Sequence, residues 1–255
     1  MTAAELAALA ENPWAFIEPS ADAERIENER FCLTISPSRV WGGICRLRLR
    51  PEQVEEAVGE LRGLTDGVEL VTWNVGPSAT PSGLPERLRE LGLGDPGPPL
   101  DPVCAALVLA KEPPPVDGIE VRRVGSFGDF LTGLEIILAA DTWSEDGAAG
   151  ERRRARENYE RGQRRGGLQW LAYLDGRPVA YAEAARSPVG LYLGGGATLP
   201  DARGHGCYRA LVRERWDEAV RLGLPGLAVQ AKYHTSAPIL RRLDFREVAT
   251  IHTLQ

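Results

Sequence analysis

The sequence has few of the residues and segments that mark whole classes of protein. It holds three histidines among 255 residues, and its four cysteines are scattered with no CxxC pair, so we expect no metal site. No apolar run approaches the ~20 residues that span a membrane. The first residues lack the basic region and apolar core of a secretory signal. We therefore expect a cytoplasmic protein with free thiols and no membrane partner.

The charge balance argues against a further class. The formal net charge is −6 and the pI is about 5.3, which disfavours a nucleic-acid binder that neutralises phosphates. Hydrophobic content of 43% and charged content of 26% are ordinary for a soluble globular protein. The length suits one large domain or two small ones. Neutral or cationic substrates remain compatible with this composition.

Two proline-rich segments, at 94–99 and 112–115, punctuate the chain. The apolar run between them, 103–109, is typical of a strand. The second segment is the better linker, because proline clusters stiffen a connection and interrupt regular structure. We therefore place a domain boundary near residue 115, giving an N-terminal lobe of 1–115 and a C-terminal domain of 116–255.

Hydrophobic periodicity predicts an α/β order in the C-terminal domain. Asp175 and Gly176 join two of its strands and signal a tight hairpin. We expect strands at 119–124, 168–174, 178–185, 191–198, 227–231 and 246–253, and helices at 129–140, 151–165, 207–222 and 236–243.

The N-terminal lobe is predicted to repeat part of that order of strands and helices. We expect strands at 46–50 and 68–75 and helices at 51–64 and 84–91. Arg50 runs directly into Pro51, so no glycine-rich turn separates strand from helix there. Because β-α-β-α order is common, chance similarity is an open alternative to an internal repeat.

The most informative segment of the C-terminal domain is the turn after the strand at 191–198. Gly204 and Gly206 leave room for a ligand to approach the backbone. The helix that follows presents unpaired N–H groups and a partial positive charge at its start. This arrangement suits a pyrophosphate.

From about residue 118 onward the sequence resembles the GCN5-related N-acetyltransferases, the GNAT superfamily. The resemblance rests on three segments: Ala197-Thr198-Leu199-Pro200 ahead of Arg203-Gly204-His205-Gly206, the helix Leu211–Ala219 followed by Leu222-Gly223, and Ser236–Phe245. It implies an α/β GNAT fold, with a mixed, mostly antiparallel sheet flanked by helices. It also implies that the first half is a degenerate GNAT-like lobe, as in two-lobed bacterial members.

The same resemblance implies acetyl-CoA as co-substrate. Backbone groups of Ala197, Thr198 and Leu199 would pair with the pantetheine arm. The residues whose turn would hold the pyrophosphate are Arg203, Gly204, His205, Gly206, Cys207 and Tyr208. Arg203 would add charge or brace the loop. Apart from the resemblance, a helix start favours a lowered pKa of the Cys207 thiol, but we expect the amide of Cys207 to be the group that matters.

Three positions depart from the family pattern. Tyr208 stands where glycine or alanine is usual, and Asp244 replaces the glycine before Phe245, which implies strain or a different helix exit. Leu240 occupies the position of a tyrosine that protonates the leaving thiolate in many members. That role therefore cannot be transferred to this chain.

The chemistry needs a base for the amine proton and an acid for the thiolate. We expect Glu183 to be the base, with an exposed strand carboxylate as the alternative. We expect Tyr233 to be the acid, rather than a loop residue that only packs; His234 is a second candidate. Trp143, with Asp141 and Glu145, would line an acidic acceptor pocket or else cover the core.

The helix at 151–165 is dense in arginine. Its arginines interleave with glutamates, which indicates a solvated helix with ion pairs. The alternative is a basic surface that meets the 3′-phosphate of CoA.

We expect an N-acetyltransferase that moves an acetyl group from acetyl-CoA to a primary amine of a small molecule. A protein N-terminus or a lysine is an alternative acceptor. A GNAT-fold module that binds acyl-CoA, or nothing, and regulates a partner is the alternative function. The sequence leaves the oligomeric state open.

Overall fold

The computed structural model describes residues 2–255, which divide into two compact units. The C-terminal unit comprises Leu109–Val229 and Arg242–Asp244. The N-terminal unit comprises Thr2–Val108, Gln230–Arg241 and Phe245–Gln255. Within residues 2–255, no helix combines the length and apolarity that crossing a bilayer requires.

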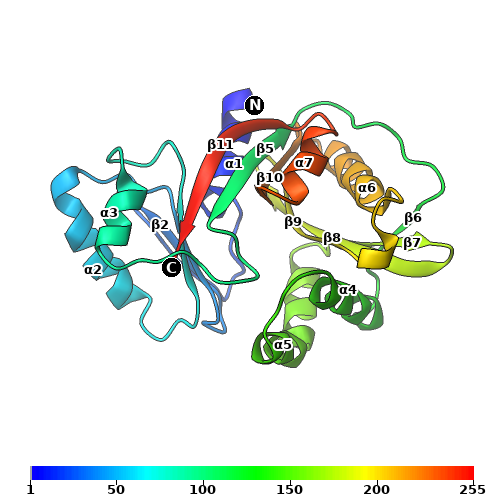
Figure 1. The fold of residues 1–255 in the computed structure, drawn as a ribbon, viewed down its shortest axis with the longest axis horizontal. Helices are drawn as coiled ribbons and strands as arrows, with labels where there is room; N and C mark the ends of the chain where they lie inside the picture. Colours follow the sequence, from blue (N-terminus) through cyan, green and yellow to red (C-terminus); the bar gives the residue numbers. More distant parts are fainter. Residues whose placement is uncertain (1) are drawn as a thin grey trace. The chain divides into compact units, whose positions relative to one another are not determined.

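The C-terminal unit is a mixed sheet between helices (Figure 1). Its elements are β6 (Glu120–Arg123), α4 (Phe127–Ala140), α5 (Glu145–Arg164), β7 (Gln169–Leu174), β8 (Arg177–Ser187), β9 (Gly190–Thr198), η3 (Pro200–Ala202), α6 (Cys207–Arg221) and the first part of β10 (Leu227–Lys232). The strand order is β10-β9-β8-β7-β6; β10 is parallel to β9 and the other pairs are antiparallel. Helix α6 packs on one face of the sheet, and α4 with α5 packs on the other. The expected mixed, mostly antiparallel α/β architecture is confirmed.

The hairpin between β7 and β8 is also confirmed. Leu174 is the register partner of Arg177, so two residues form the turn. Asp175 has φ +51° and Gly176 has φ +76°, the left-handed backbone that two-residue hairpins need.

The N-terminal unit is built on strands in the order β1-β2-β3-β4-β11-β5. Its elements are α1 (Ala3–Glu11), η1 (Pro13–Ala15), β1 (Glu24–Glu27), β2 (Cys32–Ile35), β3 (Gly42–Cys45), η2 (Pro51–Gln53), α2 (Val54–Leu64), β4 (Val71–Val75), α3 (Leu84–Glu90), β5 (Val103–Leu109), α7 (Ser236–Arg241) and β11 (Arg246–Leu254). Helices α2 and α3 bury their apolar faces in one core with β2, β3 and β4. Helix α1 packs against β11, and η1 against β2 and β3.

The two units share an order of elements. In the N-terminal unit β2, β3, α2 and β4 follow one another, with β2 antiparallel and β4 parallel to β3. In the C-terminal unit β8, β9, α6 and β10 do the same. The strand expected at 46–50 is wrong, because β3 ends at Cys45 and Arg46 leaves the strand with φ +53°. The final strand, β11, lies between β4 and β5.

The packing of α4 on the sheet leads to a stability prediction. Gly133 lies in α4 against the buried Tyr181 of β8, and a Cβ at Gly133 would lie 2.2 Å from the Tyr181 ring. Gly133→Ala should therefore lower the free energy of unfolding by about 1–3 kcal/mol through overpacking. Gly128, in the same helix, has only Ser126 Oγ in ordinary contact, at 3.6 Å from that Cβ position. Gly128→Ala should stabilise by up to about 1 kcal/mol. Urea denaturation of both variants measures the two changes in the free energy of unfolding. Equal changes would contradict the contact between Gly133 and Tyr181.

Candidate functional site

The strand pair β8–β9 contains a β-bulge at its centre. Tyr181 is the partner of Ala197 and Glu183 is the partner of Gly194, so Gly195 and Gly196 on β9 face a single residue on β8. Gly195 has φ +41°, and both glycines are exposed. A bulge leaves backbone groups outside the ladder and re-aims them. These glycines can therefore offer backbone N–H groups to a bound molecule.

The edge of β9 that faces β10 is only partly used. Parallel pairing with β10 covers Leu191 and Tyr192, whereas β9 continues to Thr198. On the other side, Ala197 and Thr198 pair with β8, and Leu199 N–H donates to the Val179 carbonyl. The Thr198 hydroxyl is buried and has no partner within residues 2–255. The end of β9 thus has an edge suited to an extended ligand.

The turn after β9 and η3 has the geometry expected of an anion-binding loop. Gly204 and Gly206 have φ +85° and +91°, and α6 starts at Cys207 without a side-chain cap. A Cβ at Gly204 would meet nothing within 4 Å, so this side of the loop is open. The amides at the start of α6 are therefore free to bind an acceptor group.

The Arg203 guanidinium braces this loop. It donates to the carbonyl of Thr198 at 3.4 Å and to the carbonyl of Ala140, at the end of α4, at 3.0 Å. These contacts favour the bracing role over a direct contribution of charge. His205 is exposed at the tip of the loop.

The expected low pKa of Cys207 is wrong. The residue is 1% exposed, and burial raises the pKa of its thiol above the ordinary value. The thiolate is disfavoured in this apolar setting even at a helix start. Cys207 therefore offers its backbone N–H to the loop, and its side chain packs in the interior.

The unusual Tyr208 packs on the bulge. A Cβ at Gly196 would lie 2.8 Å from Tyr208 Cε2, so the ring occupies the space that the glycine leaves. The Arg215 guanidinium lies 5.7 Å from the centre of the same ring. The large Tyr208 side chain on α6 thus fits because β9 has a glycine, Gly196, at the position that it packs on.

Arg215 is a buried cation that the sequence analysis missed. It is 1% exposed, donates to the carbonyls of Leu211 and Glu183 at 2.9 and 3.3 Å, and leaves Nη2 without a hydrogen bond. Burial lowers its pKa, which Tyr208 and Glu183 partly oppose. Its burial could have been predicted from helical spacing. Arg215 comes four residues after Leu211 and four before Ala219, both of which lie on the buried face of α6.

Glu183 lies beside the bulge, as a base for this site would need to. A Cβ at Gly195 would be 2.9 Å from Glu183 Cγ and Oε1. Tyr181 Oη donates to Glu183 Oε2 at 3.4 Å. Burial, and next the Glu183 charge, raise the pKa of Tyr181 well above its usual value, so this hydroxyl stays protonated and orients the carboxylate.

Tyr233 belongs to the N-terminal unit, so it does not share a unit with Glu183. It follows β10 and is half-buried. Its ring contacts His234, with centroids 5.7 Å apart, and the Arg241 guanidinium lies 4.9 Å from its centre. Its role as an acid stays a prediction.

The departure at Asp244 has a local explanation. Asp244 has φ +64°, the conformation that glycine adopts most easily at a helix exit. The Phe245 N–H donates to the Leu240 carbonyl, which closes the end of α7. The Asp244 carboxylate pairs with Lys111 at 2.8 Å. Asp244 therefore keeps the glycine-like turn at the expense of strain.

A cavity of about 340 Å³ opens between α4 and α5 in the C-terminal unit. Trp143 and Glu145 line it, and the Trp143 indole N–H is buried without a partner within residues 2–255. Glu135, also in the lining, pairs with Arg152 through two bonds of 2.7 Å. Of the three residues predicted for the acceptor site, Trp143 and Glu145 therefore line one cavity, and Asp141 does not line it.

The arginines of α5 form the ion pairs expected for a solvated helix. Arg152 pairs with Glu135, Arg154 with Glu151 and Arg161 with Glu157. Arg156 lies over the Phe127 ring, 3.6 Å from its centre.

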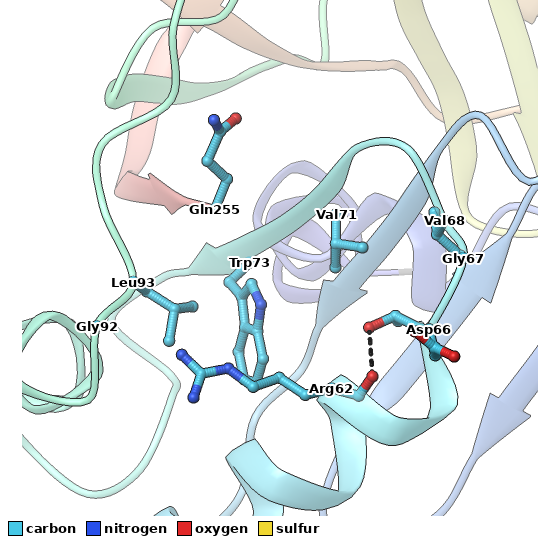
Figure 2. Close-up of a pocket in the computed structure, with 10 residues that line it drawn as sticks. Arg62, Asp66, Gly67, Val68, Val71, Trp73, Gly92, Leu93 and Gln255 are labelled. Atoms are coloured by element: carbon cyan, nitrogen blue, oxygen red, sulfur yellow. Dashed lines mark hydrogen bonds between the residues drawn. The ribbon is translucent and has the colours of Figure 1, made fainter.

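A second cavity, of about 330 Å³, lies in the N-terminal unit beside Trp73 (Figure 2). Its charged residues serve local structure: Arg62 donates to the Leu91 carbonyl at 2.9 Å, and the Asp66 carbonyl accepts from Arg39 at 2.7 Å. The Thr65 hydroxyl donates to the Leu61 carbonyl. This lining offers no paired acid and base, so the C-terminal unit holds the better candidate for catalysis.

Comparison with known proteins shows the fold of the chain. No family model matches the chain, and no curated protein matches it in sequence. It is similar to the solved structure of a GCN5-related N-acetyltransferase from Kribbella flavida, with TM-score 0.70 and 16% identity over 98% of this chain and 94% of that one. A functionally unknown conserved protein from Staphylococcus epidermidis gives TM-score 0.63 and 12% identity over 91% and 93%. A tandem GNAT protein from the clavulanic acid biosynthesis pathway gives 0.58 and 13% over 98% and 86%.

Proposed function

Because the chain has the GNAT fold, we propose that it is an acetyl-CoA-dependent N-acetyltransferase whose active site lies in the C-terminal unit. The observation that carries this proposal is the junction of β9 and α6. There a bulge, a partly unpaired strand edge and an uncapped helix start with two left-handed glycines follow one another in sequence. These three features, in this order, suit a thioester on a long arm with a pyrophosphate at its far end.

The residues fit acetyl-CoA as substrate. The amides of Gly204 to Tyr208 would bind the pyrophosphate, and the edge at Ala197, Thr198 and Leu199 would pair with the pantetheine amides. The backbone N–H groups of Gly195 and Gly196 would donate hydrogen bonds to the thioester oxygen and stabilise the negative charge that develops on it. Arg215 places a buried positive charge behind this bulge, through the Glu183 carbonyl and the Tyr208 ring.

The transfer requires a neutral amine to attack the thioester carbon. The C–N bond forms, the C–S bond breaks, and the amine proton passes to Glu183 directly or through water. Tyr181 keeps the Glu183 carboxylate oriented by its hydrogen bond. Tyr233 belongs to the N-terminal unit, so its role as donor of a proton to the leaving thiolate stays a sequence prediction outside this proposed site.

For the acceptor we propose a primary amine on a small molecule. The cavity between α4 and α5 supports this, because it combines the Trp143 ring with the Glu145 carboxylate. An aromatic face and a negative charge attract an alkylammonium ion.

The test is acetyl-CoA calorimetry followed by thiol release against a panel of amines. We expect one molecule of acetyl-CoA per chain, since the connection from Cys45 to η2 has no glycine turn, and thiol release with cationic amines above neutral analogues. No binding at all would overturn the proposal. Binding without thiol release from any amine would favour the alternative, a GNAT-fold module that senses acyl-CoA.

A further inference from the structure

Two cysteines in the N-terminal unit face each other across neighbouring strands. Cys32 on β2 is the register partner of Cys45 on β3, in an antiparallel pair. Directly opposed residues share one face of the sheet, with Cβ atoms about 4.5–5.5 Å apart. Both thiols are free and both residues are 0% exposed. A disulfide needs Cβ atoms about 3.5–4.5 Å apart, so a small adjustment would bring the sulfurs into bonding range.

The 3-10 turn η1 lies against this pair. The Cys32 thiol donates to the Trp14 carbonyl of η1 at 3.7 Å, and the Cys45 thiol interacts with the Ala15 backbone. The Trp14 ring packs edge-on against Trp41, with centroids 4.6 Å apart, and both tryptophans are half-buried. Residues of η1 therefore contact both thiols.

The two thiols are chemically different. A hydrogen bond from Cys45, with help from the positive charges of Arg25 and Arg46, lowers the pKa of Cys32 to about 7, against the opposing effects of burial and Glu27. The same hydrogen bond and burial raise the pKa of Cys45 well above its ordinary value. Arg46 also keeps a buried Nε without a partner in the described chain. The thiolate is thus favoured at Cys32 rather than at Cys45.

We propose that Cys32 and Cys45 form a reactive dithiol that a hydroperoxide oxidises to a cross-strand disulfide. The Cys32 thiolate attacks one peroxide oxygen, the O–O bond breaks, and Cys32 becomes a sulfenic acid while water leaves. The Cys45 sulfur then attacks the Cys32 sulfur, forming the S–S bond and releasing a second water. Two thiols lose two electrons and two protons, and hydrogen peroxide is reduced to two waters. This reaction is independent of acetyl transfer.

Tryptic peptide mapping of the full chain tests the proposal directly. Trypsin places each cysteine in its own peptide, within 31–39, 40–46, 90–111 and 204–209. After hydrogen peroxide treatment and alkylation of the unfolded protein, we expect 31–39 and 40–46 linked, two hydrogens lighter than the sum, and separated again by dithiothreitol. The matched controls are Cys104, whose pKa burial raises to about 11, and Cys207; both should remain alkylatable.

Variants identify the order of attack. In Cys45→Ser, a dimedone adduct should appear on 31–39, because the sulfenic acid has lost its resolving thiol. In Cys32→Ser, Cys45 should react at least tenfold more slowly than Cys32 does in the wild-type chain. Oxidation first at Cys104 or Cys207, or a sulfinic acid at Cys32 with Cys45 still free, would overturn the proposal. The wild-type map alone decides the matter if either variant fails to fold.

Discussion

Replacing Glu183 by glutamine should lower kcat for amine acetylation by about 10²–10⁴-fold, the range expected for loss of a general base. The substitution keeps the shape of the side chain, so the neighbouring bulge at Gly195 should keep its geometry. The dissociation constant of acetyl-CoA should stay within about twofold, because the loop at Gly204 and Gly206 is untouched. Steady-state kinetics across pH, with calorimetry for the co-substrate, measures both quantities.

Glu120→Gln is the matched control. Glu120 is an exposed strand carboxylate on β6 that pairs with Arg122, so its loss should leave turnover unchanged. Unchanged turnover and an unchanged pH profile in Glu183→Gln would show that Glu183 is not the general base. An inactive wild-type chain would instead contradict the proposed function itself.

The second large effect concerns Gly206→Ala, which should weaken acetyl-CoA binding by about 5–30-fold. Gly206 has φ +91°, and a Cβ there would lie 3.2 Å from Arg209 Nη2 and 3.5 Å from Val116 Cγ1. A left-handed residue other than glycine costs about 1–2 kcal/mol, so the loop should relax and move its amides away from the pyrophosphate. Calorimetry with acetyl-CoA and with CoA checks the change.

Gly223→Ala separates strain from binding. Gly223 follows α6 with φ +69°, and a Cβ there would meet nothing within 4 Å. In Gly223→Ala, the same kind of backbone strain should lower the free energy of unfolding by about 1–2 kcal/mol. The variant should nevertheless bind acetyl-CoA as tightly as the wild-type chain does. Equal loss of affinity for acetyl-CoA in both variants would contradict a specific role of the Gly206 loop in binding.

Strong local signals made most of the fold predictable. The strand at Val103–Leu109 and the start of α6 at Cys207 were predicted to the residue, because an apolar run and a glycine turn bound them. The elements α1, β1 and β2 were missed. All four residues of β2 are buried, so it shows no polar alternation, and the four residues of β1 are mostly charged. Such short segments are strands only because neighbouring strands complete them.

The site was predictable where the backbone alone determines it. A loop of the Gly204–Gly206 type needs glycine, so its residues are visible in the sequence. The bulge at Gly195 depends on the register between β8 and β9, which no local pattern encodes. The burial of Arg215 and the partnership of Tyr208 with Gly196 likewise arise from packing between elements.

The position of β11 has a consequence for biosynthesis. This strand pairs with β4 on one side and β5 on the other, although it ends at Leu254. The sheet of the N-terminal unit therefore cannot be completed during translation until the residues of β11 have left the ribosome. Contacts over such sequence separations slow folding and leave strand edges exposed in the meantime. Until then, the edges of β4 and β5 that β11 pairs with in the folded unit stay unpaired.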